Sequence, residues 1–289
     1  MSVTVDAATA GDLGHLAGRS DPLFTDTAVD VNDVNAEQVM VSFTYKAAAE
    51  IGELGDNTRS LRASIAADTA LRRLLSLEGA RVIVLGHTRW ASVGVISEPN
   101  THPLNSTETE VASAGPYAIA SLNGDVDNHG DLRVDHALAI HDKITTDAKV
   151  IPVMWSRRLA DGLDPAEAFR RTVMTFEGSV AVCGQCVVDP DLVMLALAGS
   201  GQGLYVGLAP DAYVIASEPY GVVADATEYV RMDGESGGEI LALDAAVGGR
   251  AGISRRAYDG TEQPIDDNDI ATAEVTTRDI DLGDAPHYL

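Results

Sequence analysis

The strongest clue to the architecture of this chain is Gly86-His87-Thr88-Arg89-Trp90-Ala91-Ser92, followed by Ser97-Glu98-Pro99-Asn100-Thr101-His102-Pro103 and by Leu122-Asn123-Gly124. A short apolar run, residues 81–85, precedes the first stretch and predicts a buried strand with the motif at its end. Residues 117–122 form a second such run and lead into Asn123-Gly124. We therefore expect both motifs at strand ends.

Outward from these motifs, the hydrophobic pattern changes along the chain. Residues 1–40 are acidic with few large apolar side chains, and we interpret them as a poorly packed lead-in or insertion. Helical periodicity covers residues 47–77, with a break near Gly55-Asp56-Asn57 where Asp56 or Asn57 could cap the second helix. Two more helices are expected over residues 147–159 and 165–175, the second starting at Asp164-Pro165.

Short strand-like runs dominate the region after residue 178. They are separated by turn residues and lie at 179–188, 192–198, 203–208, 213–216 and 239–243. Strands without helices between them pair antiparallel. Helices layered over antiparallel strands predict an α+β domain.

Composition limits the possible partners. The chain of 289 residues is 45% hydrophobic and carries 44 acidic against 20 basic residues, a formal net charge of -24. Such a surface repels nucleic acid and anionic membranes. No apolar run reaches the ~18 residues of a membrane span, and no basic leader is evident. We expect a cytoplasmic protein that binds neither nucleic acid nor membrane.

The two cysteines, Cys183 and Cys186, have the spacing of a zinc or redox half-site. No second pair accompanies them, and both fall on strand positions, so buried structural thiols are favoured. His87 and His102 lack metal-ligand spacing. We expect neither a metal nor another cofactor.

Together, the three motifs resemble those of the class II glutamine amidotransferases, most closely the glutaminase half of glucosamine-6-phosphate synthase, also called glutamine–fructose-6-phosphate transaminase. The resemblance covers about residues 40–289. It implies the four-layer αββα sandwich of the Ntn hydrolases. It also implies hydrolysis of glutamine to glutamate, with the ammonia used to convert fructose 6-phosphate to glucosamine 6-phosphate.

The resemblance assigns roles to four residues. Arg89 would clamp the glutamine carboxylate, as a guanidinium fork does well. The Asn123 amide and the Gly124 N–H would form the oxyanion hole. Asp147 would bind the substrate amino group. Each has a structural alternative: a surface salt bridge for Arg89, a hairpin turn for Asn123-Gly124, and a helix N-cap for Asp147.

Further positions keep or depart from the family pattern. Ser92 stands where the family has threonine and would keep a hydroxyl at the substrate. Trp90 matches a tryptophan that closes the ammonia path, although a core aromatic role is an equal alternative. Val93 replaces a common histidine, and Lys149 replaces an acid next to Asp147 in the family segment.

The domain boundaries follow from the same comparison. Residues 41–248 would form the amidotransferase domain, and residues 249–289 a linker. The tail Pro286-His287-Tyr288 resembles the entry to the phosphosugar-isomerase (SIS) domains of the synthases. A separate SIS domain would then bind the sugar phosphate, and we expect the full-length protein to be a homodimer.

The family nucleophile is an amino-terminal cysteine, and this chain has no cysteine before Cys183. We therefore expect a fold incomplete at its N-terminus and no hydrolysis by this chain alone. An inactive glutamine-binding or regulatory module is the main alternative. Another class II amidotransferase is a third, against which Glu98-Pro99-Asn100 and the tail both argue.

Overall fold

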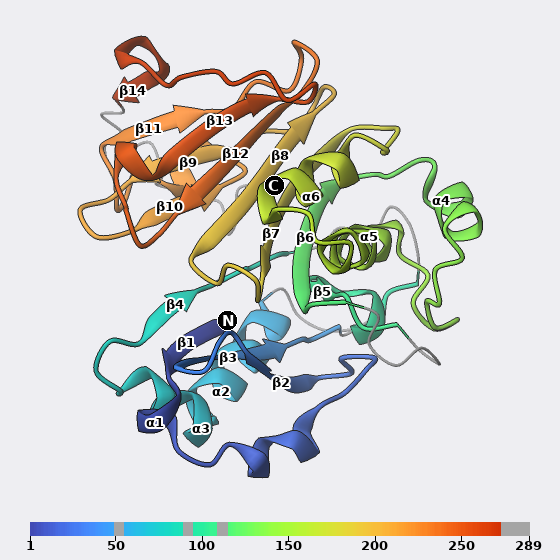
Figure 1. Ribbon diagram of the computed structural model, residues 1–289, viewed down its shortest axis with the longest axis vertical. Coiled ribbons are helices and arrows are strands. Elements are labelled where there is room, and N and C mark those ends of the chain that lie inside the picture. The colour runs from blue at the N-terminus through green and yellow to red at the C-terminus, as the bar shows by residue number, and fades with distance from the viewer. Residues whose placement is uncertain (49–54, 89–94, 109–114, 273–289) are drawn as a thin grey trace.

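The computed structural model describes residues 1–48, 55–88, 95–108 and 115–272. Its strands form three antiparallel sheets, ordered β2-β3-β1-β4, β10-β9-β11-β14 and β13-β12-β8-β7-β6-β5 (Figure 1). The strands are β1 (Ser2–Asp6), β2 (Thr27–Asp33), β3 (Gln38–Tyr45), β4 (Arg81–Ile83), β5 (Leu104–Asn105), β6 (Ala118–Gly124), β7 (Val180–Cys186), β8 (Leu192–Ala198), β9 (Tyr205–Leu208), β10 (Tyr213–Ala216), β11 (Glu228–Arg231), β12 (Glu239–Asp244), β13 (Ile253–Ala257) and β14 (Ile270–Thr272). The helices are α1 (Ala7–Ala10), α2 (Asp56–Ala67), α3 (Thr69–Leu75), α4 (His129–Asp135), α5 (Val150–Ala160) and α6 (Pro165–Val173), and the short 3-10 turns η1 (Gly14–Arg19), η2 (Glu98–Asn100), η3 (Asp147–Lys149), η4 (Pro219–Gly221), η5 (Arg250–Gly252) and η6 (Asp267–Asp269) join them.

Helices α5 and α6 cover one face of the six-stranded sheet. Trp155 and Phe169 meet edge to face, with ring centroids 5.0 Å apart, and pack on the alternate apolar residues of β6 to β8. Burying each such side chain away from water adds roughly 1.5–3 kcal/mol to the free energy of unfolding. As predicted, Asp164 caps α6 by accepting from the Ala166 and Glu167 N–H groups.

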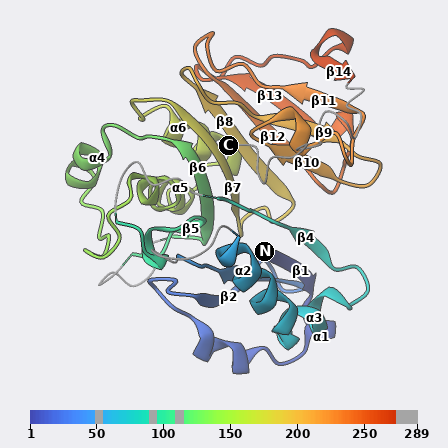
Figure 2. The ribbon, with the colours of Figure 1, turned by 180° about the vertical axis from the view of Figure 1, so that it is seen from behind.

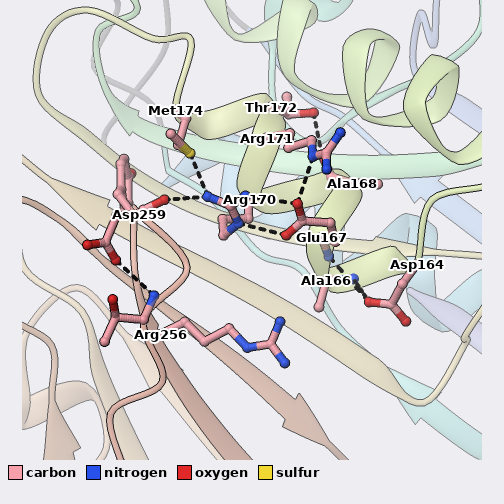
Figure 3. A network of polar contacts seen from close by, with 12 residues as sticks. Asp164, Ala166, Glu167, Ala168, Arg170, Arg171, Thr172, Met174, Arg256 and Asp259 are labelled. Atoms are coloured by element: carbon pink, nitrogen blue, oxygen red, sulfur yellow. Dashed lines mark hydrogen bonds and ion pairs between the residues drawn. The ribbon is translucent and has the colours of Figure 1, made fainter.

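A polar network connects α6 to the residue that follows β13 (Figure 3). Glu167 accepts from Arg170 and Arg171 one turn later on the same helix. Arg170 also donates to the Tyr258 carbonyl at 2.6 Å, just after β13. None of these residues belongs to the sequence motifs, and we assign the network a structural role.

The two four-stranded sheets cover the other face of the six-stranded sheet. Leu195 and Leu241 pack against Val206 and Val230 of the β9–β11 sheet, and Ile119 of β6 packs against Met40 of β3. Beyond the β1–β4 sheet lie α2 and α3 (Figure 2), with α3 contributing Leu71 and Leu74 to that core. The order of layers is therefore helix, sheet, sheet, helix.

The N-terminal segment differs from its prediction as a poorly packed lead-in. Strand β1 pairs with both β3 and β4, and β2 pairs with β3. Val3 and Val29 are fully buried, while the alternate Ser2 side chain is buried against Ser42 at 3.0 Å. Ser2 and Thr4, small polar residues that are buried, hid β1 from the hydrophobic pattern.

Two other boundaries also differ. Helix α2 begins at Asp56 with Gly55 as its N-cap, so neither Asp56 nor Asn57 caps it, and residues 47 and 48 are not helical. The predicted linker does not begin at residue 249, because β13 pairs along β12 and β14 pairs with β11. Within the described residues there is no helix long and apolar enough to cross a membrane.

Candidate functional site

Three of the predicted site residues, Arg89, Trp90 and Ser92, lie outside the described residues, as does Val93. Their roles stay predictions. The segment that leads to them is described as far as Thr88, and the chain resumes at Val95.

Asn123 and Gly124 end strand β6 and pair with Ala181 and Val180 of β7. They are part of a regular ladder, which excludes the two-residue hairpin turn as their role. Gly124 has φ 116°, and a Cβ there would lie 2.0 Å from the Ser179 carbonyl oxygen. Only glycine fits this close approach of two backbones.

Asp147 lies against the turn that follows Gly124. Its side chain belongs to a residue only 4% exposed, and its Oδ2 accepts from the Val126 N–H at 2.7 Å. Its Oδ1 accepts from the Thr146 hydroxyl at 3.2 Å. The carboxylate thus contacts the turn that follows β6. The N-cap of η3 is Thr146, not Asp147.

Asn100 ties the second motif to the loop that carries Asp147. Its buried Oδ1 accepts from the Thr145 N–H at 2.7 Å and the Thr146 N–H at 3.0 Å. Its Nδ2 donates to the Val95 carbonyl at 3.1 Å and the Ser97 hydroxyl at 3.0 Å. One amide therefore orders both loops.

His87 of the first motif and His102 of the second connect these segments to the third motif. Their rings lie with centroids 4.5 Å apart and planes tilted by 34°. The Nδ1 of His102 accepts from the Leu122 N–H at 3.2 Å, directly before Asn123. Residues up to 60 positions apart in the sequence thus converge on the end of β6.

Lys149 is buried beside this convergence. The residue is 1% exposed, and its Nζ donates to the Asn105 carbonyl at 2.6 Å, the Asn105 Oδ1 at 3.2 Å and the Thr107 carbonyl at 2.9 Å. Burial lowers the pKa of Lys149 to about 7. The lysine fastens η3 to the end of β5.

The end of β6 opens on a cavity of about 1000 Å³. Asn123, Ser121 and Cys183 contribute to one wall, and residues 82–88 contribute to another. A second cavity of about 800 Å³ shares residues 84–88 with the first. The segment that leads into the Arg89 motif therefore separates two cavities.

The cysteines are free thiols, and Cys186 is buried as predicted. Burial raises the pKa of Cys183 to about 12 and of Cys186 to about 11, so both stay protonated at neutral pH. No cluster of His, Cys, Asp or Glu that could hold a metal occurs among the described residues.

Known proteins share both sequence and fold with this chain, although a scan of protein families finds no match. Glutamine–fructose-6-phosphate aminotransferase of Geobacillus kaustophilus is 28% identical over 223 residues, 76% of this chain and 33% of that protein. The enzyme of the same name from Bacillus licheniformis is 29% identical over 211 residues, 71% of this chain and 31% of that protein.

Among solved structures, the glutamine phosphoribosylpyrophosphate amidotransferase of B. subtilis, complexed with ADP and GMP, matches with a TM-score of 0.50 and 17% identity. The match covers 89% of this chain and 49% of that one. This chain has the fold of a class II glutamine amidotransferase. The predicted α+β, Ntn-hydrolase architecture is confirmed. The chain spans about a third of the length of the curated relatives it matches.

Two residues beyond the predicted site hold its segments together. Asn100 and His102 fix the segments that carry Asp147 and Asn123 through backbone N–H groups, which is a structural role. Their spacing, Asn100-Thr101-His102-Pro103, was the available signal. Their partners are backbone amides of distant segments, which no local pattern reveals.

Proposed function

We propose that this chain is the glutaminase part of an enzyme like glutamine–fructose-6-phosphate aminotransferase. It binds glutamine at the end of β6, and the ammonia goes to fructose 6-phosphate held by a separate SIS domain. The full-length protein is a homodimer in this proposal, and residues 273–289 belong to the connection between the two parts.

The observation that carries the proposal is the convergence of the sequence motifs on one turn. Asn123 lines the larger cavity, and the Asp147 carboxylate is hydrogen-bonded to the Val126 N–H, two residues after Gly124. A substrate amide held there needs donors for a developing oxyanion, which the Asn123 amide and the Gly124 N–H supply.

The remaining roles complete the recognition of glutamine. Asp147 is an anion for the substrate ammonium group, and its carboxylate has acceptor capacity beyond the two hydrogen bonds it makes. Arg89 clamps the substrate carboxylate bidentately. Ser92 adds a hydroxyl, and Trp90 closes the path of the ammonia.

Hydrolysis requires a nucleophile that this stretch of 289 residues does not offer in the family position, since the first cysteine is Cys183. We therefore propose that residues 1–289, expressed as such, bind glutamine without releasing glutamate. The aminotransferase names of the relatives favour an enzyme over a regulatory module with a lost activity.

Thermal unfolding with and without L-glutamine tests the proposal. At a ligand concentration of about 100 times the Kd, binding adds about 2.7 kcal/mol to the free energy of unfolding, and we expect the Tm to rise by roughly 5–10 °C. Arg89→Ala should abolish this rise. Arg62→Ala, which changes an exposed arginine on α2, is the matched control and should keep it. An unchanged rise in the Arg89 variant would refute the carboxylate clamp.

A further inference from the structure

The second cavity, of about 800 Å³, contains side chains that the proposed glutamine site does not use. Its lining includes Thr44 and Lys46 at the end of β3, the first turn of α2, and residues 101–103. It lies across residues 84–88 from the cavity that Asn123 lines. A ligand there would thus occupy a different space from one bound at Asn123.

Lys46 is a buried amine that has no polar partner among the described residues. The residue is 6% exposed, and among the described residues no hydrogen-bond acceptor contacts its Nζ. The Nζ lies 5.1 Å from the centroid of the Phe24 ring. A buried ammonium group normally has an anion or several acceptors in direct contact, and the described residues supply none to this one.

Thr44 adds an unpartnered hydroxyl to the same lining. The residue is 2% exposed, and within the described part of the chain its Oγ1 has no hydrogen-bond partner. A buried hydroxyl left unpaired is costly, and an acceptor oxygen in the cavity would satisfy it. The two groups, two positions apart at the end of β3, can both donate to the same kind of ligand atom, an acceptor oxygen.

Helix α2 contributes a third favourable element. Its 12 residues begin at Asp56, and Gly55 to Thr58 line the cavity. The N-terminus of a helix of this length carries a partial positive charge and N–H donors. Asp56 also lines the cavity, but its carboxylate is engaged by Arg59.

We propose that this second cavity binds a small oxyanion, a carboxylate or phosphate group, through Lys46, Thr44 and the first turn of α2. An oxyanion offers acceptors to all three and neutralises the buried ammonium group. Burial lowers the pKa of Lys46 to about 7, with the positive charge of Lys149 adding to the effect. A bound anion would stabilise the protonated amine. The carboxylates of Asp21 and Glu98, which do not line the cavity, already raise the pKa of Lys46.

Isothermal titration of residues 1–289 with inorganic phosphate and, separately, with acetate tests the proposal, in chloride buffer of constant ionic strength. We expect saturable binding of at least one of the two at one site per chain. Phosphate alone would identify a phosphorylated ligand, and acetate alone a carboxylate. If neither anion binds, the proposal is wrong.

Variants assign the binding to the named groups. Lys46→Met keeps the packing on Phe24 and should raise the Kd at least about tenfold, while Thr44→Val should raise it several-fold. Lys143→Met, at an exposed lysine, should leave it unchanged. A Lys46→Met variant that binds the anion with the wild-type Kd would overturn the proposal.

Two further measurements separate this site from folding and from glutamine. Without anion, the Tm of Lys46→Met should equal or exceed that of the wild type, because an unpaired buried amine is removed. Asn123→Ala should weaken glutamine binding and leave the Kd of the anion unchanged. Loss of both in the Asn123 variant would mean one shared site and would overturn the assignment to the second cavity.

Discussion

Replacing Asp147 by asparagine separates the charge of the carboxylate from its hydrogen bonds. In the wild type, Oδ2 accepts from the buried Val126 N–H at 2.7 Å, and Oδ1 accepts from Thr146 at 3.2 Å. An asparagine keeps one oxygen for Val126, and its NH₂ group can donate to the Thr146 hydroxyl, which can rotate to accept. The fold should therefore survive this change.

The magnitudes follow from these contacts. A neutral acceptor in place of a charged one costs about 1 kcal/mol of the free energy of unfolding, because charge-assisted hydrogen bonds are about twice as strong. Asp147→Ala should cost about 1–3 kcal/mol more, since it leaves the Val126 N–H buried and unsatisfied. For glutamine, loss of the charged partner of the substrate ammonium should raise the Kd about 10- to 150-fold.

Urea unfolding followed by circular dichroism and calorimetric titration with L-glutamine measure the two effects. Asp142→Asn, at an exposed position in the preceding loop, is the matched control and should change neither. An Asp147→Asn variant that binds glutamine within twofold of the wild type would refute the role in substrate binding. A stability loss above about 3 kcal/mol in that variant would show that the carboxylate serves the fold instead.

Two predictions concern the framework around the site. Gly124→Ala places a Cβ 2.0 Å from the Ser179 oxygen at φ 116°, so we expect at least about 4 kcal/mol of destabilisation in urea unfolding, and a normal midpoint would contradict the described end of β6. Burial alone would raise the pKa of the Asp68 carboxyl, but hydrogen bonds from Arg19, the Leu71 N–H and Tyr45 bring it down to about 2. Because this is below the unfolded value of about 3.9, the carboxylate stabilises the fold above about pH 5 and loses that effect as the pH falls toward 2. The stability difference between wild type and Asp68→Asn should shrink over that range, and a constant difference would contradict the pairing.

The sequence was sufficient where local chemistry defines an element. Asp164-Pro165 predicted the start of α6, and the capping hydrogen bonds are present. The strand after residue 117 was predicted to deliver Asn123-Gly124, and β6 does so. Turn residues and alternating apolar positions act within a few residues, so both can be read without a structure.

The sequence was not sufficient where the buried side chains are polar. Ser2, Thr4, Ser42 and Thr44 are all buried between the sheets, and a hydrophobic pattern treats such residues as exposed. Strand β1, which carries Ser2 and Thr4, was missed for this reason. The burial of Lys46 could not be predicted either, since a lysine at the end of a strand normally reaches solvent.

Asp68 shows a second limit. It ends α2 and caps α3 by accepting from the Ala70 and Leu71 N–H groups, which divides a stretch predicted as one helix. Its partner Arg19 is 49 positions away. The division depends on that tertiary contact as well as on the local cap, and the sequence analysis predicted neither.

Calorimetric titration of residues 1–289 with L-glutamine is the most direct test of the account, with D-glutamine as the stereochemical control. The account predicts saturable binding of one L-glutamine per chain, abolished by Arg89→Ala and weakened by Asp147→Asn. No saturable heat for L-glutamine, or equal binding of the two enantiomers, would contradict the assignment of the β6 turn as a glutamine site.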